Sequence, residues 1–347
     1  TYGFNLFCIS LFASTSFLIL RDSKKEIIVF ILFVMITLSF NFFGSQRLEK
    51  FNNIEANKLD YKLRVISSNV SIDRFYNDTD PISVINDLIK ISSPQNNVKT
   101  IFIWPEGILP DISKDQLKEY KFLFENEFDE NHILSIGIND IKKEGQIIKY
   151  FNSLTIYNHK LEILNSYNKV NLVPFGEFLP FEKIFSLIGL KTITNNYQSY
   201  SRGEKRNIIE VNKINFSIRL LPLICYEIIY SGNIFNSRDF DFIINISEDG
   251  WFGQSIGPHQ HFVHSIYRAI ESGKYVLRSA NNGIAAIVNP LGVVEKQVDL
   301  NQSGFVDLFE TKKIEPTIFS KYGNKIFAIV ILLYISLIFS FNRIENE

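Results

Sequence analysis

The stretch Leu220-Leu221-Pro222-Leu223-Ile224-Cys225-Tyr226-Glu227 decides how the rest of the chain is interpreted. Its apolar run is typical of a buried strand, and the run carries a cysteine, a tyrosine and a carboxylate at its end. Cys225 is one of two cysteines in the chain, and the other, Cys8, lies in an apolar segment near the N-terminus. No disulfide partner for Cys225 is therefore evident.

Length and charge limit the class of protein. A chain of 347 residues exceeds a typical small domain, which predicts one large domain with additional segments. The 36 Lys and Arg residues almost balance the 37 Asp and Glu residues, and the net charge is -1. Such a chain has no field for holding a polyanion, so we exclude nucleic acid as a partner.

Three apolar runs predict transmembrane helices, at residues 4–20, 27–43 and 326–341. The first two carry no charge and lie at the lower limit for crossing a hydrocarbon core of ~30 Å. The third is slightly shorter, but Lys325 and Arg343 flank it and can reach the interface. A buried core helix or a signal peptide is the alternative for one of them. The first run, however, has neither a basic leader nor a small-residue cleavage site.

The charges between these runs predict the topology. The linker Arg21-Asp22-Ser23-Lys24-Lys25-Glu26 is rich in basic residues, which places it in the cytoplasm. Residues 1–46 then hold two spans and this linker, and residues 323–347 hold the last span and a short cytoplasmic tail. The domain between them, residues 50–322, would face the periplasm from the inner membrane of a bacterium. Because Thr1 stands at the edge of a span, we expect the chain to be truncated upstream.

Strand-like and helix-like segments alternate through the domain, which predicts a layered α/β fold with helices outside strands. Helices are expected at residues 81–91, 114–128 and 259–272. A hairpin is expected around residues 158–160. The expected strands cover residues 63–70, 100–104, 132–139, 147–157, 161–167, 214–225, 240–246, 275–279, 284–289 and 293–298.

Three reactive side chains each follow a β-rich apolar run, where the loops of an α/β sheet gather their sites: Glu106, Lys169 and Cys225. A cysteine can form a thioester, and a nearby carboxylate can take and return its proton. A lysine ammonium can stabilise the tetrahedral oxyanion. Singly, each residue has a simpler interpretation, as an inert core cysteine, a solvated loop carboxylate or a turn cap. Together they have the composition of an acyl-transfer site.

The sequence around these three residues resembles a known family. Trp104-Pro105-Glu106, the stretch from Tyr167 to Glu177, and Cys225-Tyr226-Glu227 resemble the Glu-Lys-Cys triad of the carbon-nitrogen hydrolase (nitrilase) superfamily. The run Val173-Pro174-Phe175-Gly176-Glu177 is similar to that of the apolipoprotein N-acyltransferase family within it, as are two later stretches at residues 245–253 and 268–283. The resemblance implies an α/β fold, a nitrilase-like αββα sandwich flanked by transmembrane α-helices.

The resemblance also implies roles for individual residues. Glu106 would be the general base and acid, Lys169 the oxyanion stabiliser and Cys225 the nucleophile. Glu177, Tyr226 and Glu227 would support this triad. Three aromatic residues would belong to loops that cover the lipid-binding cleft: Trp104, Trp251 and Phe252.

The activity implied is N-acyl transfer in lipoprotein maturation. An acyl chain would move from a phospholipid to Cys225, and then to the α-amino group of the S-diacylglyceryl cysteine of an apolipoprotein. The chemistry needs no metal ion and no organic cofactor. Two alternatives are a membrane-anchored amidase or nitrilase acting on a soluble C–N substrate, and an inactive scaffold in lipoprotein sorting. The family carries more spans than the three found here, so we expect upstream helices to be missing.

Two positions depart from the residues usual in the family. Ser67 stands where the family often has Gln, and Glu248 stands where Asn is commoner. Neither belongs to the predicted triad.

Two further features have competing interpretations. His259, His261 and His264 are grouped, but on a helix the first two point to different faces and no carboxylate or cysteine stands at ligand spacing. We therefore favour helix surface or packing near the site over a metal site. Residues 178–191 carry apolar side chains at helical spacing. This pattern favours core packing, and the alternative is an apolar lip that dips into the membrane surface.

Overall fold

The computed structural model describes residues 2–20, 24–181, 199–213, 216–232 and 239–345. The chain divides into two compact units. The larger comprises Ala56–Tyr230 and Asn236–Ile314, and the smaller comprises Thr1–Glu55, Ser231–Phe235 and Glu315–Glu347. The predicted apolar lip lies outside the described residues from residue 182 onward, as do residues 21–23 of the predicted basic linker.

The first sheet of the larger unit is mixed. Its strands follow the order β13-β1-β2-β4-β5-β6, and β3 pairs with β4 beside this path. The pairs β1–β2, β2–β4 and β3–β4 are parallel, and the other pairs are antiparallel. The bounds are β1 (Asn57–Ser67), β2 (Thr100–Ile103), β3 (Leu109–Ser113), β4 (His132–Glu144), β5 (Ile147–Asn158), β6 (Ile163–Asn168) and β13 (Gly304–Thr311).

The second sheet is also mixed, in the order β12-β11-β10-β9-β8-β7. Strands β8, β9 and β10 run parallel, and the outer strands are antiparallel to their neighbours. The bounds are β7 (Ile209–Lys213), β8 (Phe216–Ile224), β9 (Phe242–Glu248), β10 (Tyr275–Asn281), β11 (Ala285–Val288) and β12 (Val294–Val298).

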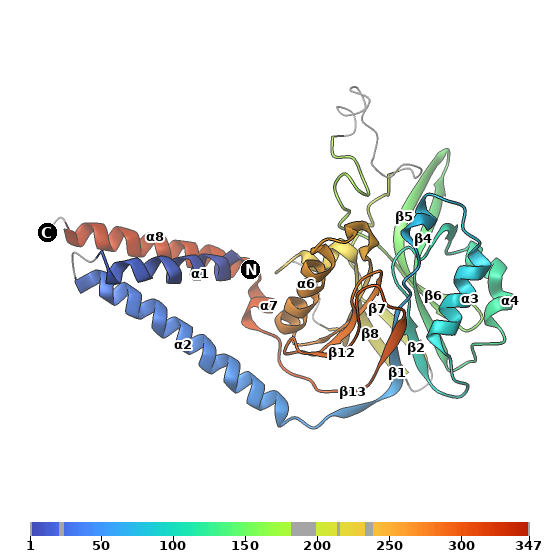
Figure 1. Ribbon diagram of the computed structural model, residues 1–347, viewed down its shortest axis with the longest axis horizontal. Helices are drawn as coiled ribbons and strands as arrows, with labels where there is room; N and C mark the ends of the chain where they lie inside the picture. Colours follow the sequence, from blue (N-terminus) through green and yellow to red (C-terminus); the bar gives the residue numbers. More distant parts are fainter. Residues whose placement is uncertain (1, 21–23, 182–198, 214–215, 233–238, 346–347) are drawn as a thin grey trace. The chain divides into compact units, whose positions relative to one another are not determined.

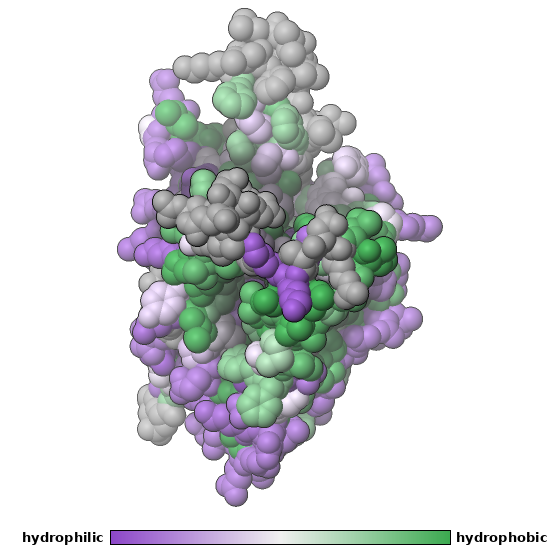
Figure 2. All heavy atoms as spheres, turned by 90° about the vertical axis from the view of Figure 1, so that its left-hand side faces the viewer, coloured by the Kyte–Doolittle hydropathy of each residue, from purple (hydrophilic) through white to green (hydrophobic). Residues whose placement is uncertain are grey.

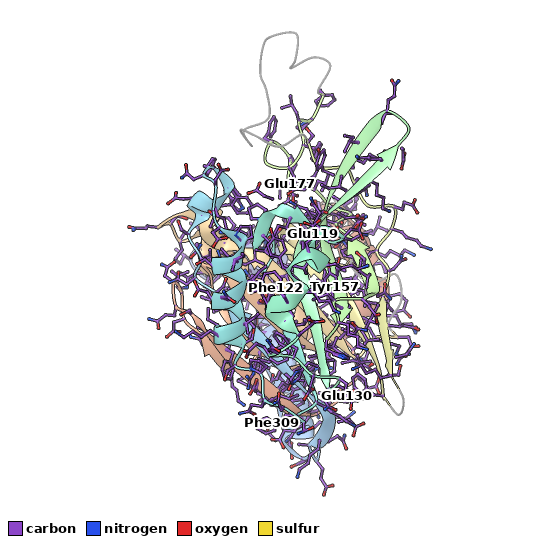
Figure 3. The ribbon with its side chains drawn as sticks, turned by 90° about the vertical axis from the view of Figure 1, so that its right-hand side faces the viewer. Glu119, Phe122, Glu130, Tyr157, Glu177 and Phe309 are labelled. Carbon is purple, nitrogen blue, oxygen red and sulfur yellow. The ribbon has the colours of Figure 1, made fainter. Side chains whose placement is uncertain are left out.

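Helices cover the outer faces of the two sheets, which gives the four layers seen in Figure 1. Helix α6 (Gly257–Ser272) lies on the second sheet, and α3 (Pro81–Ser92) and α4 (Lys121–Phe124) lie on the first. In Figure 3, α3 and α4 lie in front of the first sheet, and Glu177 lies at the opposite end of it from Glu130 and Phe309. The larger unit is thus an α/β sandwich of two mixed sheets, as the sequence predicted.

The core forms because the central parallel strands are buried on both faces. In β2, Ile101 and Ile103 face the second sheet, whereas Phe102 and the following Trp104 face the helices. Each of these four side chains is fully buried. Burying one such side chain contributes ~1.5–3 kcal/mol, so packing on both faces stabilises β2 at the centre of the sandwich.

Most predicted elements appear near their expected positions, and the exceptions have local causes. Three strands were not predicted: β3, β7 and β13. The predicted helix at residues 114–128 is wrong, because this segment contains only the 3₁₀ turn η3 (Gln116–Tyr120) and the short α4. Its apolar residues Leu117, Phe124 and Phe128 are buried from these two turns, and no longer helix is needed to bury them.

The smaller unit is helical. It contains α1 (Tyr2–Ser14), η1 (Thr15–Leu18), α2 (Lys24–Asn52), α7 (Ile318–Tyr322) and α8 (Lys325–Glu345). Within the described residues, α2 alone is long and apolar enough to cross a membrane, and residues 2–18 and 325–339 form shorter apolar helices. Many apolar side chains of this unit are exposed, and Figure 2 shows apolar side chains at the surface.

Candidate active site

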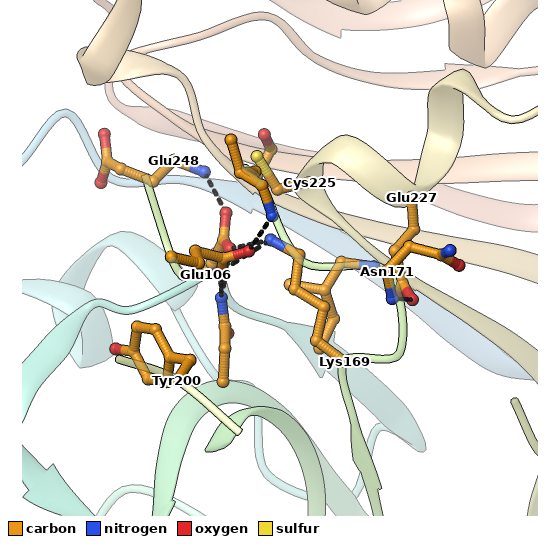
Figure 4. Close-up of polar contacts among 12 residues, drawn as sticks. Glu106, Lys169, Asn171, Tyr200, Cys225, Glu227 and Glu248 are labelled. Carbon is orange, nitrogen blue, oxygen red and sulfur yellow. Dashed lines mark hydrogen bonds and ion pairs between the residues drawn. The ribbon is translucent and has the colours of Figure 1, made fainter. Parts of the chain in front are cut away.

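The direction of the strands brings the predicted residues together. Glu106 lies just beyond the carboxyl end of β2. Strand β6 is two antiparallel steps from β4, so it runs in the same direction as β2 and delivers Lys169 to the same edge. Cys225 follows β8, in the second sheet. Figure 4 shows the three side chains gathered in one place, where loops from both sheets meet.

The Lys169 ammonium lies between two carboxylates. Its Nζ is 3.3 Å from Oε1 of Glu106 and 2.9 Å from Oε1 of Glu177, and its side chain is 1% exposed. Burial alone would lower the pKa of Lys169, but Glu106 and Glu177 raise it well above its ordinary value. Lys169 is therefore charged. Two of its three protons face the carboxylates, which leaves one for a further acceptor.

Asn152 of β5 also holds the two carboxylates in place. Its Nδ2 donates to Oε1 of Glu106 at 2.6 Å and to Oε1 of Glu177 at 2.9 Å. The other oxygen of Glu106 accepts from the backbone N–H of Glu248 at 2.9 Å. Sequence reasoning did not identify Asn152. The available signal was a polar residue within a run of β5 that is otherwise almost fully buried.

Cys225 begins the 3₁₀ turn η4 (Cys225–Ile229) and adopts a left-handed backbone with φ of 48°. This conformation costs a non-glycine residue ~1–3 kcal/mol, so surrounding contacts must maintain it. Burial, followed by the charge of Glu106, raises the pKa of the thiol, although Lys169 opposes this shift. The thiol is thus protonated at neutral pH and requires a base, and Glu106 is the carboxylate whose charge acts on it most.

Glu227 ties the turn at Cys225 to the loop at Lys169. Its side chain is 0% exposed. One carboxylate oxygen accepts from the backbone N–H of Ile224 at 2.9 Å. The other oxygen accepts from four donors: the Tyr167 hydroxyl (2.7 Å), the backbone N–H groups of Val170 (2.9 Å) and Asn171 (3.0 Å), and the Arg206 guanidinium (3.1 Å). Arg206 was not predicted, because it stands in a loop with other charged residues.

Glu248 stands where the family resemblance predicts Asn. The positive charge of Arg74 balances the additional carboxylate. The buried carboxylate of Glu248 pairs with the buried Arg74. It also accepts from Asn281 Nδ2 and from the backbone N–H of Gly250, each at 2.8 Å. Burial raises the pKa of Glu248, and Arg74 opposes that shift. The Glu248 carboxylate therefore has a cationic partner and hydrogen-bond donors, although it lies close to Glu106.

The three aromatic residues predicted for the cleft loops differ in their positions. Trp104 is 0% exposed, donates from Nε1 to Ser92 Oγ at 2.9 Å and packs in the layer under α3 and α4. Its assignment to a cleft loop is wrong, because its ring is fully buried between the first sheet and these helices. Trp251 and Phe252 are 49% and 39% exposed in η5 (Asp249–Phe252), and the Trp251 ring lies 4.9 Å from that of Phe75. Tyr226 is half-buried, with its ring 5.5 Å from that of Tyr230.

The grouped histidines of α6 point in different directions. His259 is exposed, His261 is buried and His264 is half-buried. Within the described ranges, no three His, Cys, Asp or Glu side chains are arranged to hold a metal ion.

His264 predicts a pH dependence of stability. Burial, together with the positive charge of Arg268, lowers its pKa from 6.5 to about 4. Between these values the unfolded chain binds more protons than the folded one, so stability falls as the pH drops through this window. We expect His264→Gln to reduce this loss, measured as the change in melting temperature between pH 7 and pH 4.5. His259→Gln is the matched control and should keep the wild-type dependence. An undiminished loss in His264→Gln would contradict the prediction.

The sequence of this chain matches a known protein family. The carbon-nitrogen hydrolase family model matches residues 101–307. Among curated proteins, the apolipoprotein N-acyltransferase of Rickettsia prowazekii is 35% identical over 73% of this chain and 52% of its own length. That of Bradyrhizobium diazoefficiens is 29% identical over 97% of this chain and 64% of its own length. The chain thus spans about half to two thirds of the length of these relatives.

Solved structures of the nitrilase superfamily are also similar. Nit3 of Saccharomyces cerevisiae matches with a TM-score of 0.47 and 17% identity, over 72% of this chain and 90% of that one. XC1258 of Xanthomonas campestris matches with a TM-score of 0.48 and 14% identity, over 71% of this chain and 89% of that one. The family match covers the strands that carry Glu106, Lys169 and Cys225. The chain belongs to the carbon-nitrogen hydrolase family, and the curated relatives described above are apolipoprotein N-acyltransferases.

Proposed function

We propose that this chain carries the catalytic domain of an apolipoprotein N-acyltransferase, which moves an acyl chain from a phospholipid to the N-terminus of a diacylglyceryl apolipoprotein. The observation that carries the proposal is the placement of Lys169 between Glu106 and Glu177, at the site of Cys225. The similar curated proteins described above, which are apolipoprotein N-acyltransferases, support the choice of these substrates.

The first half-reaction acylates the enzyme. Glu106 takes the proton of the Cys225 thiol, and the sulfur attacks the ester carbonyl of the phospholipid. The oxyanion that forms accepts a hydrogen bond from the remaining proton of Lys169, because the other two face Glu106 and Glu177. The C–O bond then breaks, the departing oxygen takes the proton back from Glu106, and a lysophospholipid leaves a thioester behind.

The second half-reaction transfers the acyl chain. The free α-amino group of the S-diacylglyceryl cysteine attacks the thioester carbonyl, and Glu106 accepts a proton from this nitrogen. The C–S bond breaks, an amide forms, and the sulfur of Cys225 regains a proton from Glu106. The exposed Trp251 and Phe252 supply apolar surface for a lipid substrate.

The proposed setting is the inner membrane of a bacterium. Residues 4–20, 27–43 and 326–341 would span it, and residues 50–322 would face the periplasm. The apolar α2 supports one span, and the shorter apolar helices at residues 2–18 and 325–339 are the candidates for the other two.

The alternative, an amidase or nitrilase that hydrolyses a soluble substrate, uses the same three side chains, and a single experiment separates the two. The full-length protein is incubated with phospholipid vesicles, and the peptide containing Cys225 is analysed by mass spectrometry. We expect a long-chain acyl adduct in the wild type and in the matched control Cys8→Ala, and none in Cys225→Ala. A wild type that carries no adduct but hydrolyses a short amide would reject the transferase.

A further inference from the structure

We propose that His261 is a positioning residue that holds the backbone of Cys225 through its carbonyl group. The inference deepens the proposed function and rests on it, since it assumes that Cys225 is the nucleophile. His261 comes from α6, an element that supplies none of the residues in the mechanism above.

The two ring nitrogens of His261 contact the backbone of Cys225 and the side chain of Asp249. Nε2 lies 3.2 Å from the carbonyl oxygen of Cys225, and Nδ1 lies 2.9 Å from Oδ1 of Asp249. A carbonyl oxygen cannot donate, and neither can an ionised carboxylate. Nε2 therefore donates to the Cys225 carbonyl, and Nδ1 lies between the Asp249 carboxylate and Arg278 Nη2, which is 3.2 Å away.

Asp249 is ionised and rigidly held. Burial opposes its ionisation, but Arg278 and His261 lower its pKa to about 2. Arg278, 0% exposed in β10, donates to its two oxygens at 2.7 and 3.0 Å, and Ser247 Oγ donates at 2.7 Å. Gly283 lies directly against this carboxylate, where any Cβ would clash with it. Asp249, which contacts His261, is thus itself held by residues of the central strands β9 and β10.

The carbonyl that His261 contacts belongs to the strained residue of the site. Cys225 has φ of 48°, and its peptide plane sets where the sulfur lies relative to Glu106 and Lys169. A chain of contacts from Arg278 through Asp249 and His261 to the Cys225 carbonyl fixes this plane. Because a displacement of ~1 Å can slow a reaction ~10²-fold, loss of the last contact should slow the chemical step.

The test compares two amides at position 261. A Gln side chain can place its nitrogen close to the position of Nε2, whereas that of Asn reaches only the position of Nδ1. The readout is acylation of Cys225 in the full-length protein by the p-nitrophenyl ester of a short fatty acid, followed as the burst of p-nitrophenol. We expect His261→Asn to lower the maximal rate by ~10-fold or more with an unchanged half-saturating concentration, and His261→Gln to stay within ~3-fold of the wild type. The exposed His259→Gln should match the wild type.

Equal losses in the Asn and Gln variants, or no loss in either, would overturn the proposal, because a purely structural role does not distinguish where the donor lies. If His261→Asn does not fold, His261→Gln is compared with His261→Met, which has a similar length but no donor. A Met variant as fast as the Gln variant would also overturn it. The ester needs no lipid donor, so a protein that never accepts a phospholipid acyl chain would still report the effect of His261.

Discussion

Lys169→Met is expected to slow acylation of Cys225 by ~10²-fold or more, because it removes a donor aimed at the oxyanion. The nearest polar neighbours of the ammonium are the carboxylates of Glu106 and Glu177, which would repel an oxyanion. The rate is measured with the ester probe under single-turnover conditions, so that chemistry is separated from product release.

The same substitution should destabilise the larger unit. It leaves two buried carboxylates that share the amide of Asn152 and have lost their common cation. Removing one partner of a buried ion pair costs ~3–5 kcal/mol. The loss is measured as the difference in the free energy of unfolding between Lys169→Met and the wild type at pH 7.

The control for Lys169→Met is Lys149→Met. Lys149 pairs with Glu144 at the exposed end of the hairpin formed by β4 and β5. An exposed pair contributes ~0–1 kcal/mol, so this variant should keep the stability and the rate of the wild type. A Lys169→Met protein with unchanged rate and stability would show that the ammonium neither balances the two carboxylates nor assists the reaction.

The sequence indicated Glu106, Lys169 and Cys225 because each lies near the end of a β-rich run and within a motif that resembles the family. It could not locate Asn152, Arg206 or Arg74 in the same way. Arg206 lies 21 positions before its partner Glu227, and Arg74 lies 174 positions before Glu248. Only the folded structure shows that such distant residues meet.

The error at Trp104 has a related cause. A strand buried on both faces carries apolar residues without interruption, so its sequence does not show which face is which. The run from Thr100 to Trp104 is of this kind. Only the contact of Ile101 and Ile103 with the second sheet shows that Trp104 points to the helices.

Glu227→Gln should be the most damaging single change outside Glu106, Lys169 and Cys225. The amide group can leave an oxygen facing Tyr167 and Arg206, but its NH₂ must then face the N–H of Ile224, which is also a donor. Arg206 also loses its ionic partner, and the charge of Glu227 is the main influence that raises the pKa of Arg206 against burial. We expect a loss of ~3–5 kcal/mol, as for a broken buried pair. That corresponds to a melting temperature lower by about 6–20 °C.

A double-mutant cycle isolates the ion pair from the other contacts of Glu227. Arg206→Met alone leaves the carboxylate with its four remaining donors, so it should cost less than Glu227→Gln. In the double variant no buried charge lacks a partner, and its loss should be smaller than the sum of the two single losses. Glu204→Gln, exposed in the same segment as Arg206, controls for charge removal and should match the wild type. Additive losses would mean that Arg206 and Glu227 act independently. In that case, the turn at Cys225 would be held to the loop at Lys169 by the hydrogen bonds that Glu227 accepts from the Tyr167 hydroxyl and from the backbone.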